Sequence, residues 1–498
     1  MFHFLQGETE TTHINAIVQM GASTRMTDRR FLEREITAWK QSARRNAQIL
    51  GEKYYNGEHD ILKRRRMVIA ENGELKPVKN LPNSRIVDNQ YAKMVDQKVN
   101  YLLGKPVTFD TEDQAYTDAL LEIFDTHFLR QLRILGEDAL DGGVGWLMPY
   151  YDDEGAFCFR RFEPYEILPF WADTEHTRLD AAVRLYEVEA YEGEAKRIVE
   201  HVEAFSQDGI SYYVRENGTL VPEAPYHTSY AVFDHAPLNW TRIPLIAWKA
   251  NAKEIPLIRR VKALQDGINL MESIFENGML EDPHNTILVL VNYDGTSLGE
   301  FRRNLATYGA VKVRNDVGGP NGDVKTLSVE VNAENYQTIL RLFKQALVEN
   351  ARGYDAKDDR LGNNPNQMNI QSMYSDIDLD ANTMETEFQA AFRSLIWFVD
   401  AHLANMGRGD FEDVPVKITF NRDVLINTSE RIQQCKDSIG LVSDRTLLAN
   451  HPFVKDVDQE LSLLKAQKEE EMKSVYGENV FPKDKEDSGQ SPPVSKDA

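Results

Sequence analysis

The chain has 498 residues, roughly three times the length of a typical domain, so we expect several structural units. Apolar residues make up 42% of it and charged residues 27%, a balance that allows a sizeable buried core. No stretch approaches about 18 uncharged apolar residues, and residues 1–20 lack the basic and apolar blocks of a signal peptide. We therefore expect a soluble protein that is made inside a cell and has no membrane partner. The only cysteines are Cys158 and Cys435, which excludes a disulfide framework and a thiolate zinc site.

The charge balance bears on nucleic-acid binding. The sequence has 57 Lys and Arg against 79 Asp and Glu, a net charge of −22. So acidic a chain disfavours tight binding of DNA by phosphate neutralisation, which requires a basic surface. It still permits a wall past which DNA moves without sticking, because like charges repel.

Helical periodicity dominates the N-terminal part of the chain. Residues 29–57 carry apolar side chains at helical spacing, and we expect that helix to close near Gly51 and Gly57. A second helix is predicted over residues 84–103. It stops at Gly104, because a proline at position 106 cannot continue the hydrogen-bond ladder.

From about residue 144 to residue 250 the pattern changes to short runs rich in Tyr, Phe, Val and Ile. The dipeptides Asp208-Gly209 and Asn217-Gly218 separate such runs, and dipeptides of this kind are strong hairpin signals. The segment is therefore predicted to be an antiparallel β region.

The next segment predicts a helical hairpin. Residues 257–282, between Pro256 and Pro283, contain no proline and have apolar positions in steps of three and four, which indicates a helix about 39 Å long. Residues 285–331 follow as a compact α/β insert with strands at 286–291, 310–314 and 324–331. A second helix is predicted over residues 332–353, with Asn332 as its N-cap and Gly353 just past its end.

The C-terminal part begins with a polar loop over residues 354–367. One long helix is predicted after it, because residues 366–406 contain neither Gly nor Pro. A strand follows within 368–426, then helices over 427–476, and the polar end 477–498 is expected to be disordered. The predicted fold class is α+β and rich in helices.

One enzyme motif matches literally, since residues 295–299 have the sequence G-x-S-x-G of a nucleophile elbow. The same Ser297 forms a capping box with Glu300, in which the hydroxyl starts a helix. A hydrolase also needs a histidine, and both His402 and His451 lie in predicted helical segments. We favour the helix cap, and a soluble serine hydrolase that uses Ser297 stays as the alternative.

Other chemical motifs fail on spacing. Asp376, Asp378, Asp380 and Glu387 occupy calcium-loop positions, but Ala381 stands where the sharp turn requires glycine, so a solvated acidic face on a helix is favoured. The nucleotide-binding motif G-x-x-x-x-G-K-[ST] and the zinc motif H-E-x-x-H do not occur. The sequence predicts no catalytic residue, no metal and no cofactor.

Several strings together resemble a known family. They are YYNGEHDIL (54–62), IVDNQYAKMVDQKVNYLLGKPVTF (86–109), DGGVGWLMPYYDDEG (141–155), RRFEPYEILPFWAD (160–173) and RIPLIAWKAN (242–251). In these strings, and in the order of its elements from about residue 30 to 475, the chain resembles the portal proteins of tailed double-stranded DNA bacteriophages. The resemblance is to the branch typical of phages with long non-contractile tails.

The resemblance implies a place for each segment in a ring, generally of twelve subunits, at one capsid vertex. Residues 1–256 would form the wing and body, together with the long helix and strand of 368–426. The helices 257–284 and 332–353 would form the stem, and 285–331 the clip. Residues 354–367 would form the tunnel loop that points into the channel. Residues 427–476 would form the crown.

The resemblance also implies the function and the partners. The ring would conduct double-stranded DNA during packaging and ejection, at the capsid vertex of the virion, after synthesis in the host bacterial cytoplasm. The implied partners are further copies of the chain, the terminase large subunit that carries the ATPase, a head-completion or adaptor protein, and the major capsid and scaffolding proteins. Another oligomeric head–tail connector component stays as a further alternative.

The resemblance places two sets of candidate residues. The DNA-facing residues of the tunnel loop would be Lys357, Asp358, Asp359, Arg360, Asn363 and Asn364. The partner surface of the clip would include Val289, Val291, Lys312, Arg314 and Lys325. The mixed charge of the loop suits weak and replaceable contacts with DNA.

Overall fold

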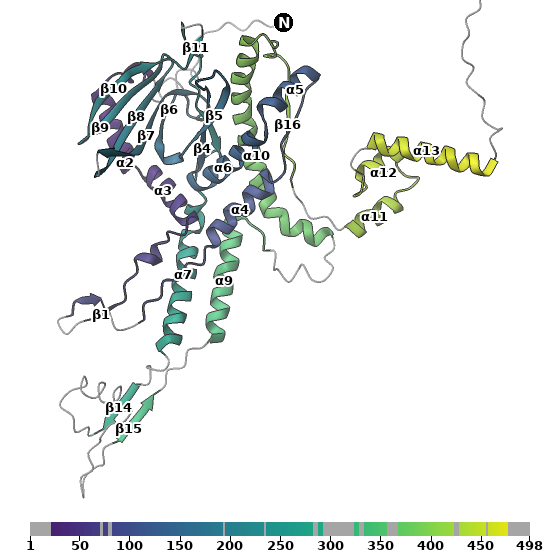
Figure 1. Ribbon diagram of the computed structural model, residues 1–498. Helices are drawn as coiled ribbons and strands as arrows, with labels where there is room; N and C mark the ends of the chain where they lie inside the picture. Colours follow the sequence, from purple (N-terminus) through teal and green to yellow (C-terminus); the bar gives the residue numbers. More distant parts are fainter. Residues whose placement is uncertain are drawn as a thin grey trace, which may run out of the picture. The chain divides into compact units, whose positions relative to one another are not determined.

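The computed structural model describes residues 21–69, 73–77, 82–192, 195–233, 236–281, 287–291, 323–327, 333–355, 367–422, 428–454 and 457–476 (Figure 1). The chain divides into two compact units. The first comprises Met1–Ala356 with Met373–Val424, and the second comprises Lys357–Ser372 with Leu425–Ala498. Within the described ranges, no helix combines the length and the apolar character needed to cross a bilayer.

The N-terminal helices differ from the prediction. Residues 29–57 form two helices, α2 (Arg29–Gln41) and α3 (Ala43–Tyr55), rather than one. Ser42 separates them, because it adopts an extended conformation and its hydroxyl accepts a hydrogen bond from the N–H of Arg45 at 3.1 Å. Gly51 lies inside α3, where a Cβ atom would come within 2.1 Å of the Asp141 carbonyl oxygen. This glycine therefore allows a close approach of two backbones and does not end the helix.

The predicted antiparallel β region is confirmed. Its larger sheet has the strand order β10-β9-β8-β7-β6, with bounds Thr219–Thr228, Gly209–Glu216, Ala195–Ser206, Leu179–Glu192 and Ile167–Trp171. A second sheet has the order β13-β4-β5, with bounds Ile246–Lys249, Val144–Tyr151 and Phe157–Phe162. The predicted Asn217-Gly218 turn joins β9 to β10, and both of its residues have positive φ.

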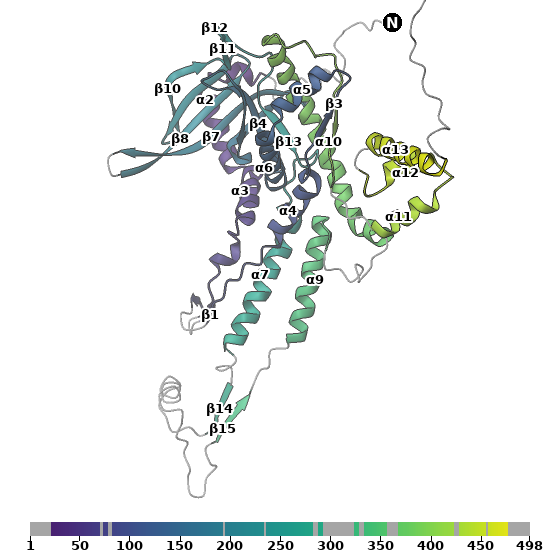
Figure 2. The same cartoon turned by 45° about the vertical axis from the view of Figure 1, so that its right-hand side comes forward.

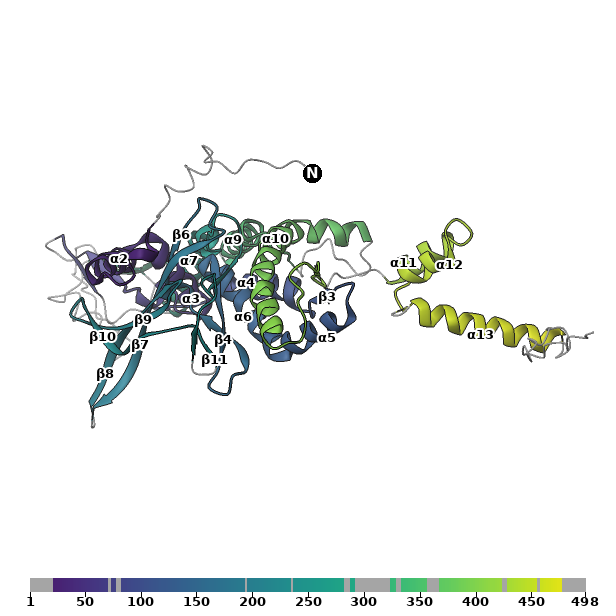
Figure 3. The same ribbon diagram turned by 90° about the horizontal axis from the view of Figure 1, so that it is seen from above.

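Part of the five-stranded sheet has a buried core on each face, and α2 lies against one of these faces (Figure 3). Leu32 and Ile36 of α2 pack with Val183 of β7 in one buried cluster. On the other face, Ala182 of β7 packs with Trp146 of β4. Neighbouring residues of one strand thus point into different cores, as the alternation of side chains along a strand requires.

Short elements complete the body. They are η1 (Ser23–Arg25), η2 (Asp60–Lys63), η3 (Pro164–Glu166), and the strand pairs β1 (Met67–Ile69) with β2 (Leu75–Pro77), β3 (Thr108–Asp110) with β16 (Lys417–Thr419), and β11 (Ala231–Phe233) with β12 (Ala236–Leu238). The helical elements are α4 (Gln90–Leu103), α5 (Gln114–Ile123), α6 (Thr126–Gly142) and α10 (Gln367–Asn405). The last confirms the predicted long helix.

An aromatic cluster fastens α10 to the body. The ring centroid of Phe392, which is fully buried, lies 4.8 Å from that of Trp248, 5.5 Å from that of Phe109 and 6.0 Å from that of Phe124. Edge-to-face pairs at such distances stabilise a core beyond the burial of area alone. The central part of α10 is therefore a core element of the first unit.

The predicted helical hairpin is confirmed as α7 (Ile258–Glu281) and α9 (Ala333–Ala351), which lie side by side (Figures 1 and 2). Gly267 allows their close approach, since a Cβ atom there would be 3.0 Å from the Phe343 ring. The ring centroids of Phe275 on α7 and Tyr336 on α9 lie 5.2 Å apart, so the two helices also pack through aromatic side chains.

A buried row of polar side chains runs along α7 at every fourth residue. Asn269, Ser273 and Asn277 accept hydrogen bonds from the N–H groups of residues 88, 86 and 84 at 3.1, 2.9 and 2.8 Å. Gln265 accepts one from the N–H of residue 91 at 2.9 Å. Four helical residues rise about 6.0 Å, and two residues of an extended chain advance about 6.2–6.8 Å, so the two repeats match. We call this arrangement the polar ladder.

The second predicted helix begins too early, because residues 84–88 belong to the polar ladder. Residues 84–88 serve as its extended side, and α4 begins only at Gln90, where the side chain of Asn89 accepts a hydrogen bond from the N–H of Ala92 at 3.0 Å. The extended residues satisfy their N–H groups through α7, so no helix is needed there.

The insert between α7 and α9 is described only in part. β14 (Ile287–Val291) pairs antiparallel with β15 (Asp323–Leu327). The predicted strand 310–314 and the predicted helix that begins at Ser297 lie outside the described residues.

The second unit contains α11 (Thr428–Asp437), α12 (Asp444–Asn450) and α13 (Val457–Tyr476) among its described residues. The hydroxyl of Ser443 caps α12 by accepting a hydrogen bond from the N–H of Thr446 at 3.3 Å. These helices confirm the helical prediction for this part of the chain. The tail 477–498 lies outside the described residues.

Candidate functional site

The structure brings together the two sides of the predicted tunnel loop. The side chain of Gln97 on α4 donates to the carbonyl of Tyr354 at 2.8 Å and accepts from its N–H at 2.9 Å. The Tyr354 ring lies 4.7 Å from the ring of Tyr374 on α10, which in turn stacks on Tyr101 of α4 at 5.7 Å. Residues 354 and 374 therefore share one anchor on α4, which we call the loop base.

The end of α9 is shaped to fit this anchor. Arg352 adopts a left-handed conformation with φ of 53°, and the N–H of Gly353 donates to the carbonyl of Val348 at 2.9 Å. A Cβ atom on Gly353 would lie 2.6 Å from the sulfur of Met94 and 2.7 Å from the side-chain oxygen of Gln97. Gly353 thus follows the helix as predicted, but it is required for close packing on α4, while Arg352 makes the left-handed turn.

A cluster of charged side chains lies next to this anchor, and we include it in the loop base. Asp380 of α10 forms ion pairs with Lys98 at 2.8 Å, Arg352 at 3.0 Å and Arg260 at 3.2 Å. Lys98 comes from α4, Arg260 from α7, and Arg352 follows α9. One carboxylate therefore joins four segments that are distant in the sequence.

Burial and charge act in opposite directions on this cluster. Burial raises the pKa of Asp380, but the three cations outweigh it and the pKa of this carboxyl is lowered. Burial lowers the pKa of Lys98, whose side chain is 4% exposed, although Asp380 opposes that shift. Lys98 also donates to the carbonyl of Arg352 at 3.0 Å. The cluster holds its charges because each has partners.

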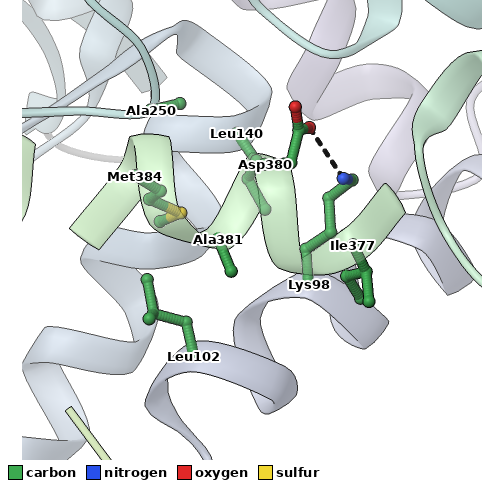
Figure 4. Close-up of a pocket in the computed structure, with 8 residues that line it drawn as sticks. All are labelled: Lys98, Leu102, Leu140, Ala250, Ile377, Asp380, Ala381 and Met384. Atoms are coloured by element: carbon green, nitrogen blue, oxygen red, sulfur yellow. Dashed lines mark hydrogen bonds and ion pairs between the residues drawn. The ribbon is translucent and has the colours of Figure 1, made fainter. Parts of the chain in front are cut away.

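Figure 4 shows the Lys98–Asp380 pair at the edge of a small cavity. The cavity has a volume of about 20 Å³, enough for one water molecule. The other side chains that line it are apolar: Leu102, Leu140, Ala250, Ile377, Ala381 and Met384. Such a space is too small and too apolar to hold a substrate.

The predicted solvated acidic face on α10 is wrong for Asp380, which lies in the cluster above. The side chain of Asp378 is 40% exposed, pairs with Arg422 at 3.2 Å and accepts a hydrogen bond from the hydroxyl of Tyr101. Arg422 also binds Glu385, so the chain that follows β16 is tied to α10. Asp376 is exposed, as predicted. All four residues of the calcium-loop match lie within a continuous helix, a conformation that cannot form that loop.

The predicted site residues fall mostly outside the described part of the chain. Those of the tunnel loop, Lys357, Asp358, Asp359, Arg360, Asn363 and Asn364, all lie there, as do Lys312 and Arg314 of the clip. The remaining clip residues lie in the strand pair, where Val289 is opposite Lys325 and Val291 is opposite Asp323. Their role as a partner surface stays a prediction.

The residues of the hydrolase alternative are placed only in part. Ser297 lies outside the described residues. His402 is on α10, where its ring stacks on Phe157 at 4.6 Å and its Nδ1 lies 3.0 Å from the hydroxyl of Tyr151. His451 follows the end of α12. Within the described ranges, no group of three or more His, Cys, Asp or Glu side chains could hold a metal ion.

Sequence reasoning missed the residues that build the loop base. Gln97 and Lys98 lie in a correctly predicted helix, but their partners are more than 250 positions away in the chain. The polar ladder could have been predicted from the sequence. Its four polar side chains are spaced by four residues and lie between apolar positions of α7: Gln265, Asn269, Ser273 and Asn277. Spacing of that kind places polar side chains on one helix face.

Comparison with known proteins identifies the class. The family model described as "Phage portal protein, SPP1 Gp6-like" matches residues 33–474. The portal protein of Bacillus phage SPP1 is 28% identical over 437 residues, which cover 85% of this chain and 83% of the relative. The portal protein of a Clostridium phage, phiCD119, is 25% identical over 429 residues, which cover 84% of this chain and 92% of the relative.

Solved structures of a gene transfer agent (GTA) show a more distant likeness. A chain from the neck of the native particle, computed with C12 symmetry, gives a TM-score of 0.37 at 13% identity. The match covers 72% of this chain and 88% of the neck chain. A chain from the neck of the empty particle, computed with C6 symmetry, gives a TM-score of 0.41 at 12% identity. That match covers 77% of this chain and 98% of the neck chain.

The family model and the two phage relatives place the chain among the structural proteins of phage particles. It belongs to the SPP1 Gp6-like family of phage portal proteins. Its function is therefore that of a portal protein, which forms the DNA channel at the capsid vertex.

Proposed function

We propose that about twelve copies of this chain close into a ring and that double-stranded DNA passes through the centre of this ring during packaging and ejection. The observation that carries the proposal is the family match over residues 33–474, which includes every helix of the stem and the loop base. Head-to-tail contacts between identical subunits close into a ring when the rotation between them permits.

The stem supports assembly because it leaves apolar surface uncovered. Ile339 and Leu342 of α9 are 40% and 53% exposed, and Leu270 of α7 is 40% exposed. Helices with apolar side chains outside their own packing interface need another surface to cover them. In a ring, the stem of the next subunit supplies that surface.

The loop base supports the role of residues 354–367 as a tunnel loop. It holds residues 354 and 374 on the same helix, so a loop between them projects from a fixed point. Lys357, Asp358, Asp359 and Arg360, with Asn363 and Asn364, would then meet DNA with two positive and two negative charges. Contacts of this kind hold phosphate weakly, as passage of DNA requires.

The clip is the proposed surface for partners outside the capsid. Val289, Val291 and Lys325 of the strand pair, with Lys312 and Arg314, would contact the terminase large subunit and later a head-completion or adaptor protein. The ATPase of packaging belongs to the terminase, and this chain contributes no catalytic group. The wing would meet the major capsid and scaffolding proteins at the virion vertex, after assembly in the host bacterial cytoplasm.

The native mass of the purified protein, with negative-stain images of the same sample, tests the ring. The chain has a mass of 57.0 kDa, so twelve copies give a species of about 684 kDa. Rings with a central hole at that mass support the proposal. A monomer that stays monomeric with its capsid and scaffolding proteins present contradicts it.

A further inference from the structure

The outer part of the β7–β8 hairpin extends beyond the rest of its sheet (Figure 2). The last residue of β7 that pairs with β6 is Arg184, and β8 first pairs with β9 at Glu200. Between these points, β7 and β8 pair only with each other, out to the pair Glu192 and Ala195. A two-stranded ribbon with free edges is marginally stable in water, so this one needs a covering surface.

The exposed side chains of this ribbon are suited to binding. Tyr191 is 72% exposed and Ile198 is 62% exposed. They lie on the same face, because Tyr191 is opposite Lys196 and Ile198 is opposite Glu189 in the register. Residues 187–198 also carry four glutamates against one lysine and one arginine. The face that carries Tyr191 and Ile198 thus also carries Glu187 and Glu189, and Lys196 on that face forms an ion pair with Glu189.

A groove of complementary character lies elsewhere in the same unit. It has a volume of about 930 Å³ and lies between the β6–β7 connection, the segment before α7 and one face of α10. Its lining includes the apolar side chains of Trp171 and Phe398. Four cationic side chains face it against two acidic ones, and Arg178 and Arg393 among the cations are exposed.

The hairpin end cannot enter the groove of its own chain. Leu179, the first residue of β7, lines the groove, and Tyr191 lies near the other end of that strand. Twelve residues of a strand span about 40 Å, so β7 holds the two surfaces apart and directs them to opposite ends. An acidic, apolar hairpin and a basic, apolar groove at opposite ends of one strand have the geometry of a head-to-tail contact.

We propose that the β7–β8 hairpin end of each subunit docks into the groove of the next subunit, with Tyr191 against the apolar floor and its glutamates facing Arg178 and Arg393. The occupant is a second copy of this chain, so the inference rests on the ring in the proposed function. It deepens that proposal by naming the two surfaces that meet in the wing.

The test is a cross-link across the contact in the full-length protein. Tyr191→Cys and Ala390→Cys are combined in one chain in which both native cysteines are changed to serine; Ala390 lines the groove and is exposed. The matched control carries Leu121→Cys, a 55% exposed position on α5, in place of Tyr191→Cys. The native mass is measured before a short bis-maleimide is added. The cross-linked products are then separated by denaturing electrophoresis.

Rings that give a ladder of covalent dimers, trimers and higher species only with the Tyr191→Cys pair support the contact. An equimolar mixture of the two single variants should stop at dimers, because each chain then has one reactive thiol. Rings without a ladder, or with an equal ladder from the control, overturn the contact and leave the ring intact. Failure of the unmodified protein to form rings counts against both the contact and the proposed function.

Discussion

Removal of the Asp380 carboxylate tests how the loop base is held together. Asp380→Ala leaves Lys98, whose side chain is 4% exposed, with a carbonyl as its remaining partner. The loss of one partner from a buried ion pair costs about 3–5 kcal/mol. The pairs with Arg260 and Arg352 are more exposed and add less than about 1 kcal/mol each. We therefore expect the free energy of unfolding of the first unit to fall by about 3–5 kcal/mol.

Thermal unfolding monitored by near-UV circular dichroism measures this loss. For a cooperative unit of this size, 1 kcal/mol corresponds to roughly 1 °C, so Tm should fall by roughly 3–6 °C. Asp376→Ala, at an exposed position one turn earlier on α10, is the matched control and should change the stability by less than about 0.5 kcal/mol. Equal Tm values for the two variants would refute the reasoning. The double variant Lys98→Met with Asp380→Leu should recover most of the loss, because an apolar pair replaces a buried ion pair at little cost.

Three further changes test other parts of the structure. Asn269→Leu removes hydrogen bonds to the N–H of Asp88, the side chain of Gln265 and the ring of His59, and should lower the stability by roughly 2–4 kcal/mol in chemical denaturation, whereas Glu276→Gln at an exposed position on the same helix should have little effect. Burial raises the pKa of Asp141 to about 7, although the hydroxyl of Tyr91 donates to it at 2.6 Å. Since the raised pKa belongs to the folded state, stability is lost as the pH rises from about 4 through 7, by roughly 4 kcal/mol at most. Asp141→Asn should therefore raise Tm at pH 8 and much less at pH 5, and equal Tm changes at both values would contradict this account. Deletion of residues 356–362 should leave the native mass of the ring unchanged and reduce DNA packaging, and normal packaging would show that the tunnel loop is misassigned.

The sequence predicted the elements that local patterns determine. The long helices α7, α9 and α10 follow from apolar spacing and from the absence of Gly and Pro, and the β9–β10 turn follows from Asn217-Gly218. Ser42 shows the limit of the apolar period, because a serine inside a helical pattern is tolerated or caps a new helix according to its φ and ψ angles.

The loop base and the polar ladder depended on partners that the sequence does not place. Asp380 has the appearance of an exposed acid until Lys98 and Arg260 are brought to it from other helices. Ile86 and its neighbours satisfy a helical period, yet the side chains of α7 offer their N–H groups a better set of acceptors. In the polar ladder the long-range contacts decided the local structure, and at the loop base they decided the surroundings of residues in correctly predicted helices.

The two sides of the polar ladder have slightly different repeats, and that difference sets a limit on its length. The extended side advances about 0.2–0.8 Å more per step than the helix. From residue 84 to residue 88 the accumulated offset is about 0.4–1.6 Å, which hydrogen bonds of 2.8 to 3.1 Å absorb by small tilts. Each further step in the same register would add to the offset until the donor and the acceptor no longer met. Asn89, the N-cap of α4, begins a different backbone geometry after those two steps, so the chain turns into a helix before the misalignment grows too large.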